Sequence, residues 1–373
     1  MTRITRRAFL STTAAGVAAT AFNPRLALAQ SDDIVFGAVL PLTGASASIG
    51  EDQRRGIELA VEKVNASGGV LGKQLRVVVE DSAGNAQTAL NAAKKLTSVD
   101  GAKVVMGEYS SGITVPLREA LAREGVVHVN CGSSSISLRQ KGGGSAYSVI
   151  GLDDLMSRFT AAALREKNFS KAAIILPNNA YGESMNGEFA KAFQAAGGEV
   201  VQTLLYTEGQ STYRRELQQI ARFQPDVYVY SAYGQEAAII NREAFELGQK
   251  QTPWFGIYLT MCVSDAPKET VEGQLGAEVN FIGPDSVWYQ EAYKAKFGED
   301  FRSAFNGYLY DAVAMSAAAI NKANATDPAA ILAAARGLEF PGATGLIKLD
   351  EDNERAVQDY LRVTVKDGKV VNA

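Results

Sequence analysis

The stretch that decides the fold begins as Val104-Val105-Met106-Gly107-Glu108-Tyr109-Ser110-Ser111-Gly112 and ends as Val126-Val127-His128-Val129-Asn130-Cys131-Gly132-Ser133-Ser134-Ser135. Each half is a short apolar run that finishes in glycine and serine. The segment between them carries apolar residues at a helical spacing, namely Val115, Leu117 and Leu121. This order predicts two parallel strands that are joined by a crossover helix.

Ligands of parallel sheets bind just beyond the carboxyl ends of the strands, which is where both serine clusters are expected to lie. A helix N-terminus at that place offers unpaired N–H groups and the positive end of the helix dipole, and serine is a preferred capping residue. The clusters therefore indicate a site for a carboxylate or another oxygen-rich group, without a metal ion. The alternative, that the serines only cap their helices, stays open at this point.

The first residues have the pattern of an export signal. Thr5-Arg6-Arg7-Ala8-Phe9-Leu10 is a twin-arginine pattern, a small and apolar run follows over residues 11–22, and Ala27-Leu28-Ala29 fits a cleavage site. We predict that residues 1–29 are a signal peptide and that the protein reaches the periplasm folded, through the twin-arginine pathway. No cysteine follows the cleavage site, so we expect no lipid anchor, and no later apolar run has the length of a membrane span.

The net charge argues against two kinds of partner. The 373-residue chain has a net charge of −4, and removal of the signal peptide takes away four arginines and no acidic residue, which leaves −8. A negative protein is not expected to bind nucleic acid or an anionic membrane. We expect a monomer whose partner is a small molecule.

The residues that carry most catalytic and metal chemistry are scarce. His128 is the only histidine, which excludes a histidine-based nucleophilic triad and a polyhistidine metal site. Cys131 and Cys262 are not at metal-ligand spacing, and we expect two buried free thiols because twin-arginine substrates fold before export. No glycine-rich dinucleotide motif follows a strand. Acidic pairs such as Asp153-Asp154 are common and are expected to be solvated. The sequence thus predicts a binding protein without cofactor or metal, not an enzyme.

Strands and helices alternate along the chain. Strands are expected over residues 34–40, 75–81, 172–176, 199–206, 227–231, 254–258 and 278–283, and helices over residues 48–64, 85–97, 153–167, 287–297 and 306–324. A hairpin over residues 360–371 closes the chain. The alternation predicts an α/β fold with parallel sheets that helices cover on both faces. Because the alternation pauses at residues 147–152, we expect two lobes around a cleft.

Six segments together resemble the leucine/isoleucine/valine-type periplasmic binding proteins, which are type I solute-binding proteins of ABC importers. They are Pro41-Leu42-Thr43-Gly44, Gly56-Ile57-Glu58-Leu59-Ala60, Asn65-Ala66-Ser67-Gly68-Gly69-Val70-Leu71-Gly72, Asp81-Ser82-Ala83-Gly84-Asn85, Gly107-Glu108-Tyr109-Ser110-Ser111 and Asn179-Ala180-Tyr181-Gly182. The resemblance covers the mature chain in order. It implies two Rossmann-like lobes with parallel central sheets, which three hinge crossings join.

The resemblance also implies where the chain passes between the lobes. The crossings are expected near Ile150-Gly151, near Asn280-Phe281 and within residues 343–346. Lobe 1 would then contain residues 31–150 plus 281–343, and lobe 2 would contain residues 151–280 plus 344–373.

Several site residues follow from the resemblance by position. Ser111, Ser133 and Ser134 match residues that bind the α-carboxylate of the ligand through hydroxyl and main-chain N–H groups. Tyr181 and Tyr233 match aromatic residues that lobe 2 presents to the ligand.

Two further positions differ from the amino-acid binders of this family. Ile49 lies near a position that is aromatic in some members. Tyr258 stands where an acidic residue holds the ammonium group of the ligand, and a buried ammonium without a carboxylate partner is costly. We therefore expect a carboxylate or an amide that lacks the α-ammonium group. The alternative is an alignment slip of a few residues, with Asp265 or Glu236 supplying the charge.

Two functions of different classes remain. The first is a transport receptor that captures a small amino-acid-like, carboxylate or amide solute and delivers it to the membrane permease of an ABC importer. The second is a ligand-sensing regulator with the same fold inside the cytoplasm. The twin-arginine signal favours transport.

Overall fold

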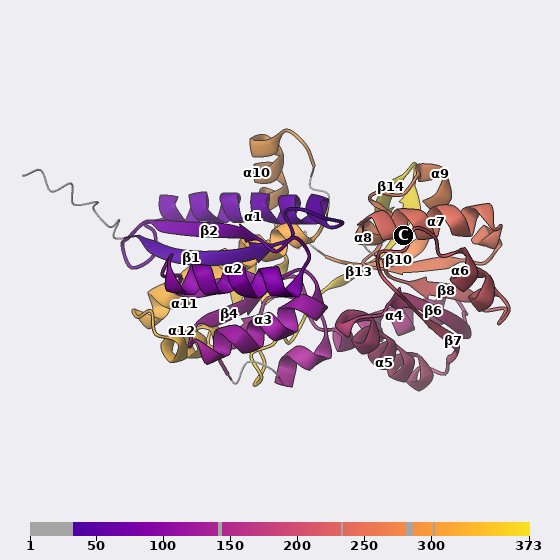
Figure 1. Cartoon of the computed structure of the whole chain (residues 1–373), viewed down its shortest axis with the longest axis horizontal. Helices are drawn as coiled ribbons and strands as arrows, with labels where there is room; N and C mark the ends of the chain where they lie inside the picture. Colours follow the sequence, from indigo (N-terminus) through magenta and orange to yellow (C-terminus); the bar gives the residue numbers. More distant parts are fainter. Residues whose placement is uncertain (1–32, 141–143, 233, 281–285, 301–302) are drawn as a thin grey trace, which may run out of the picture. The chain divides into compact units, whose positions relative to one another are not determined.

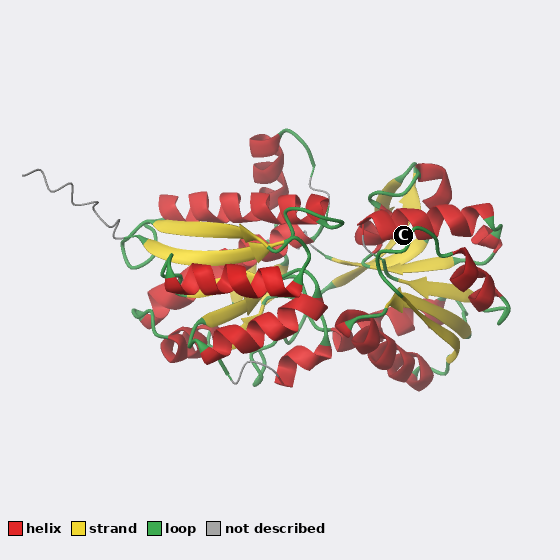
Figure 2. Ribbon diagram, viewed as in Figure 1, coloured by secondary structure: helices red, strands yellow, loops and turns green. Residues whose placement is uncertain are grey.

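Strands and helices alternate through the described part of the chain, as the sequence predicts (Figures 1 and 2). The structure is a computed structural model that describes residues 33–140, 144–232, 234–280, 286–300 and 303–373. The predicted signal peptide lies outside these residues. Residues 33–373 form one unit with two larger sheets, and we call the part of the chain built on each of these sheets a lobe.

Lobe 1 is built on five parallel strands in the order β2-β1-β3-β4-β5. They are β1 (Ile34–Leu40), β2 (Leu75–Asp81), β3 (Val104–Gly107), β4 (Val127–Asn130) and β5 (Ala146–Ser148). Four helices cover the two faces: α1 (Ala47–Ala66), α2 (Ala86–Ser98), α3 (Ser111–Arg123) and α11 (Phe305–Ala323). Successive side chains alternate between the faces, so Val105 packs with α2 and α3, whereas Met106 belongs to the core that includes α1 and α11. Strand β5 is too short for the apolar pattern to predict it.

Helices from the last third of the chain return to lobe 1, although the final strands of the chain belong to lobe 2. Helix α11 packs along α1, and a Cβ atom on Gly56 would lie 2.0 Å from the main-chain oxygen of Asn306, so this approach requires glycine. Buried Asp52 of α1 fixes the same region, because it accepts hydrogen bonds from the Tyr293 hydroxyl at 2.7 Å and the Ser303 hydroxyl at 2.8 Å. The helices α10 (Val287–Phe297) and α12 (Pro328–Arg336) complete this part.

Lobe 2 is built on a seven-stranded sheet in the order β14-β13-β10-β9-β8-β6-β7. Five strands are parallel, and the predicted closing hairpin of β13 and β14 is confirmed as an antiparallel addition. The strands are β6 (Lys171–Pro177), β7 (Glu199–Tyr206), β8 (Val227–Tyr230), β9 (Trp254–Ile257), β10 (Leu275–Val279), β13 (Tyr360–Lys366) and β14 (Lys369–Asn372). The helices are α4 (Asp153–Glu166), α5 (Ala180–Ala195), α6 (Arg214–Ala221), α7 (Gly234–Glu246), α8 (Leu259–Val263) and α9 (Lys268–Val271), with η2 (Gln249–Gln251). Strand β10 begins before the predicted range 278–283, because Leu275 to Ala277 pair with β9.

Three chain passages between the lobes lie side by side. The N–H of Gly151 donates to the side-chain oxygen of Gln358 at 2.6 Å, and the N–H of Asn280 donates to the main-chain oxygen of Asp359 at 2.9 Å. Phe281, predicted beside the second crossing, lies outside the described residues.

The third passage lies later in the chain than residues 343–346. Those residues fall within the hairpin of β11 (Phe340–Gly342) and β12 (Gly345–Ile347), and the chain joins the second sheet only at β13. Buried Arg355 holds the hairpin to lobe 1, because its guanidinium donates to the main-chain oxygens of Val149 at 2.9 Å and Leu346 at 3.1 Å.

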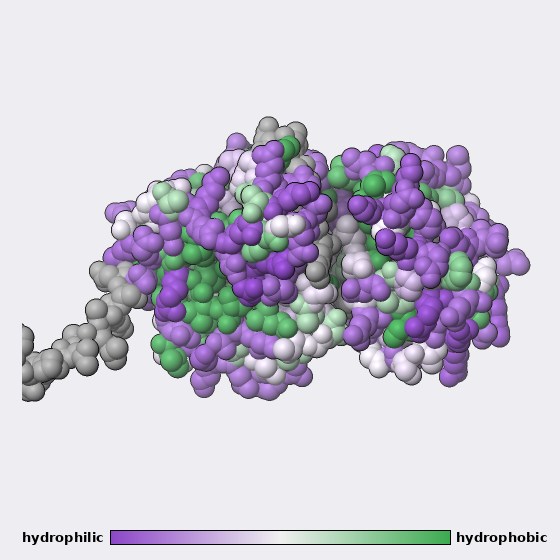
Figure 3. All heavy atoms as spheres, turned by 90° about the horizontal axis from the view of Figure 1, so that it is seen from above, coloured by the Kyte–Doolittle hydropathy of each residue, from purple (hydrophilic) through white to green (hydrophobic). Residues whose placement is uncertain are grey.

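The visible surface is mostly hydrophilic in Figure 3, and the larger apolar patch of that view lies on the lobe 1 part. Among the described residues, no helix combines the length and the apolar composition that crossing a bilayer requires.

Candidate functional site

The two serine clusters meet at one cavity, as the strand order predicts. Strands β3 and β4 are neighbours, and the residues after each strand contribute to the wall of a cavity of about 20 Å³, which we call the inner cavity. Lobe 1 and lobe 2 both line it, through Tyr109, Ser111, Gly132, Ser134, Tyr181, Tyr258, Met261 and Phe305. A volume of this size holds about one water molecule, so a solute requires the walls to move apart.

Ser111 is the first residue of α3, and this places its hydroxyl and the helix N-terminus at the inner cavity. The hydroxyl has one long hydrogen bond, from the Ser135 N–H at 3.4 Å. Ser110, at the N-cap position, makes no side-chain capping hydrogen bond. The first serine cluster therefore does not serve as a side-chain cap, which favours the ligand interpretation.

Ser133 and Ser134 differ sharply although they are neighbours. The Ser133 hydroxyl lies 2.6 Å from the Thr114 hydroxyl and 3.1 Å from the main-chain oxygen of Tyr109, and it is not among the residues that line the inner cavity. Its contacts tie the β3 loop to the β4 loop. Ser134 does line the cavity.

The tyrosines of lobe 2 form the opposite wall. The Tyr181 hydroxyl donates to the Ser231 hydroxyl at 3.0 Å, while the Tyr258 hydroxyl is buried and has no hydrogen-bond partner in the part of the chain that the structure describes. Tyr258 has a left-handed backbone with φ of 55°, which is uncommon for a residue other than glycine. Tyr233 lies outside the described residues. Ile49 lines an adjoining cavity.

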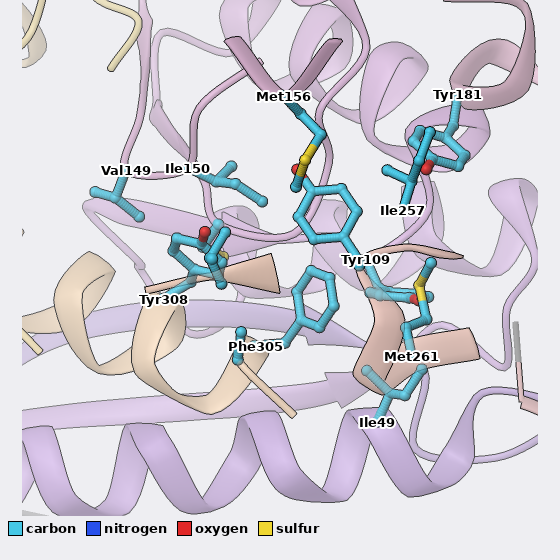
Figure 4. Packing of buried hydrophobic residues seen from close by; sticks show 14 of the residues in the cluster. Ile49, Tyr109, Val149, Ile150, Met156, Tyr181, Ile257, Met261, Phe305 and Tyr308 are labelled. Atoms are coloured by element: carbon cyan, nitrogen blue, oxygen red, sulfur yellow. The ribbon is translucent and has the colours of Figure 1, made fainter. Parts of the chain in front are cut away.

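Three apolar contributors were not predicted from the sequence. The rings of Tyr109 and Phe305 meet edge to face with centroids 5.0 Å apart, and the Tyr109 hydroxyl donates to the sulfur of Met261 (Figure 4). The ring of Tyr258 lies 6.1 Å from that of Phe305. The inner cavity is therefore mostly aromatic, with hydroxyl groups from serine and tyrosine.

The position of Asp153 differs from the expectation that the pair Asp153-Asp154 is solvated. Asp153 begins α4, is fully buried, and has two carboxylate oxygens without a hydrogen-bond partner among the described residues. Its N–H donates to the main-chain oxygen of Ser134 at 2.7 Å. Burial raises the pKa of Tyr258 well above its ordinary value, and the Asp153 carboxylate makes a smaller contribution in the same direction. Burial raises the pKa of Asp153 to about 7, an effect that the nearby hydroxyls of Ser134 and Ser184 only partly offset. A buried acid that has hydroxyls nearby, but no cationic partner among the described residues, thus lies directly behind two residues of the cavity wall.

The two acids considered as substitutes lie elsewhere. Glu236 accepts a hydrogen bond from the Gly209 N–H and does not line the inner cavity. Burial raises the pKa of Tyr213 in lobe 2, and the Glu236 carboxylate adds to this effect. Asp265 lines the adjoining cavity with Ile49.

Glu108 is a further buried acid, and it holds the loop of the first serine cluster. The Glu108 carboxylate accepts hydrogen bonds from the Ser82 hydroxyl at 2.6 Å and the Ser110 N–H at 2.7 Å. Burial raises the pKa of Glu108 to about 7. Glu108 is committed to the loop and does not line the cavity.

The remaining reactive residues are structural. His128 is buried in β4, where its ring nitrogen Nε2 lies 2.6 Å from the main-chain oxygen of Gly107, and burial lowers its pKa to about 3. Cys131 and Cys262 are buried free thiols, as predicted. Within the described ranges, no cluster of three or more potential metal ligands occurs.

Comparison with known proteins identifies the class. Residues 33–369 match the periplasmic binding protein family, and the chain belongs to that family. The fold is that of the type I periplasmic binding proteins, with mostly parallel central sheets in two lobes.

Individual relatives and solved structures agree with this assignment. The Leu/Ile/Val-binding protein BraC3 of Rhizobium johnstonii is 29% identical over 370 residues, which cover 97% of this chain and 98% of that protein. The branched-chain amino acid substrate-binding protein LivJ of Streptococcus pneumoniae, solved with isoleucine, matches with a TM-score of 0.81 at 24% identity, covering 91% of this chain and 97% of that one. A solute-binding protein of R. palustris solved with benzoate also has a TM-score of 0.81, at 21% identity, with 91% and 95% covered.

Proposed function

We propose that the protein is the solute-binding component of an ABC importer, which captures a small solute in the inner cavity and delivers it to a membrane permease. The family membership and the position of the cavity between two lobes support this function. In this proposal the protein acts as a monomer in the periplasm after twin-arginine export. Replacement of Arg6 and Arg7 by lysine should hold the precursor in the cytoplasm, and unchanged export would contradict that route.

The solute that fits best is amino-acid-like, with both a carboxylate and an ammonium group. Ser111 and Ser134 offer hydroxyls and helix-terminal N–H groups to the carboxylate. The observation that carries the proposal is Asp153, because a buried carboxylate is costly until a cation pairs with it, and Asp153 has no cationic partner among the described residues. An ammonium group that enters between Ser134 and Tyr258 supplies that cation.

In this proposal Asp153 supplies the acid that is absent at position 258. A solute without an α-ammonium group is expected where no acid faces it, because Tyr258 stands at the position of the acid; helix α4, however, brings the carboxylate of Asp153 behind Ser134 and Tyr258. Benzoate, the ligand of the R. palustris protein, shows that related folds also hold acids without an ammonium group. The two alternatives predict opposite preferences.

Calorimetry on matched pairs distinguishes them. Phenylalanine is compared with phenylpropionate, and leucine with isocaproate, on the wild type and on Asp153→Asn. Tighter binding of both amino acids, lost in Asp153→Asn, supports the zwitterionic solute. Tighter binding of both acids without an amino group would instead support the solute predicted from Tyr258.

A cytoplasmic regulator of the same fold is the second candidate. Its support is limited to the fold, whereas the sequence of residues 1–29 has an export signal pattern. Detection of the mature protein in the periplasmic fraction would decide for the transport receptor.

A further inference from the structure

Met261 separates the inner cavity from a second, larger one. The second cavity has a volume of about 370 Å³ and is lined by Ser48, Ile49, Met261, Ser264, Asp265 and Ser303; we call it the outer chamber. Met261 is common to the two linings. Met261 therefore lies between the outer chamber and a solute that is held at Ser111 and Ser134.

The side chain of Met261 is suited to give way. Methionine is unbranched and adapts its rotamers easily, so it fills space without fixing a shape. In Figure 4 it lies between Tyr109 and Ile49, with its sulfur toward the Tyr109 hydroxyl. Among the described residues, the polar contact of its side chain is this hydrogen bond to sulfur, which is a weak acceptor. A solute side chain can replace Met261 at modest cost.

Most of the residues that line the outer chamber are polar. Ser264 and Asp265 come from lobe 2 and are exposed, whereas Ser303 comes from lobe 1 and is buried. The hydroxyl and the N–H of Ser303 both donate to the buried carboxylate of Asp52, at 2.8 and 3.1 Å. The Ser303 oxygen accepts a hydrogen bond from the Phe305 N–H at 3.2 Å and keeps one lone pair for a further donor, and Asp52 adds negative charge behind it. Such a lining favours a hydrogen-bond donor or a cation.

From this arrangement we infer that the outer chamber takes the distal end of an elongated solute, whose side chain passes Met261 and ends in an ammonium or guanidinium group beside Asp265. This inference rests on the proposed function and narrows its solute to basic amino acids of the length of lysine or arginine. Ile49 supplies the apolar surface for the methylene groups of such a side chain.

Calorimetry with arginine, lysine and leucine tests the inference on the wild type, on Asp265→Asn and on Glu269→Gln. Glu269 is a matched control, because it is an exposed acid of lobe 2 that lines neither cavity. Asp265→Asn should weaken arginine and lysine about threefold to fivefold, a modest loss because solvent screens an exposed pair. Leucine should bind equally to all three proteins.

The outcomes separate this inference from the proposed function. If leucine binds while arginine and lysine do not, or if Asp265→Asn leaves their affinity unchanged, the basic solute is wrong and the amino-acid receptor stands. If none of the three amino acids binds at any concentration tested, the basic solute and the zwitterionic solute are both wrong, and the acid without an amino group is the solute to test. Tighter binding of arginine and lysine than of leucine, with the Asp265 dependence, supports both.

Discussion

The main-chain N–H of Ile136 donates a 2.9 Å hydrogen bond to the hydroxyl of Ser184, which joins lobe 1 to lobe 2 beside the inner cavity. Ile136 lies in η1 (Ile136–Gln140), directly after the second serine cluster, and Ser184 lies in the first turns of α5. The same hydroxyl lies near Asp153 and lowers its pKa. The contact between the lobes is thus adjacent to the acid that we assign to the ammonium group.

Ser184→Ala should weaken solute binding about twofold to tenfold, because one hydrogen bond contributes roughly 0.5–1.5 kcal/mol. The loss should occur mainly as faster release, which stopped-flow measurements resolve. Ser98→Ala is the control, since the Ser98 hydroxyl bonds only within α2, to the main-chain oxygen of Lys94. Unchanged affinity and release in Ser184→Ala would mean that this contact does not contribute to the bound state.

The neighbours Ser133 and Ser134 should give opposite results on mutation to alanine. Ser134→Ala should lose roughly 1.5–3 kcal/mol of binding free energy, as for a hydrogen bond to a charged group, and this loss should exceed its effect on the stability of the free protein, where the Ser134 hydroxyl lies near Asp153. Ser133→Ala should instead lower that melting temperature, because the Ser133 hydroxyl joins two loops. Calorimetry and thermal unfolding measure the two effects separately. Equal effects of both variants on binding would return Ser133 to the site.

The fold was largely predictable because its signals are local. The apolar runs along the chain determine its strands and helices, and β3 and β4 lie where the two runs that end in serine predict them. The third passage was misplaced, since Arg355 holds the β11–β12 hairpin to Val149 in lobe 1 through contacts across the sequence. Such a hydrogen-bond network leaves no periodic pattern of apolar residues in the sequence.

The candidate site could be predicted where its residues follow strand ends, but not where packing determines which residues are buried. Ser111, Ser134, Tyr181 and Tyr258 line one cavity, as neighbouring strand and helix ends require. Asp153 looked like one of many surface acids, because burial of a carboxylate depends on what packs over it. A signal was present nevertheless: Asp153 follows directly after the first crossing, where the chain passes the cavity.

The stability of the free protein should reveal the buried charge of Asp153. Burial raises the pKa of Asp153 from the ordinary value near 4 to about 7, so the folded state binds its proton more tightly than the unfolded state. This contribution is fully present below about pH 4 and is lost as the pH rises through about 7. Asp153→Asn does not titrate, so it should gain roughly 2–4 kcal/mol relative to the wild type between pH 4 and pH 8.

The control for this pH series is Asp154→Asn, because Asp154 lies on the same turn and pairs with Arg158 at 3.2 Å. Other acids, such as Glu108 and Glu278, also have pKa values raised to about 7 by burial, but they are present in every variant and cancel in the difference. Chemical denaturation at each pH measures the free energy of unfolding. A constant difference between wild type and Asp153→Asn across this range would show that Asp153 is paired in the free protein.

The hydroxyl of Tyr258 is buried and has no hydrogen-bond partner among the residues that the structure describes, so its removal should stabilise the free protein. An unsatisfied buried polar group costs roughly 1–3 kcal/mol, and Tyr258→Phe keeps the ring that packs toward Phe305. We expect the free energy of unfolding to rise by about 1 kcal/mol. Tyr181→Phe is the matched control and should fall by about 1 kcal/mol, because the Tyr181 hydroxyl donates to Ser231. If Tyr258→Phe destabilises the free protein as well, its hydroxyl has a partner there; if it also weakens solute binding, that hydroxyl contacts the solute.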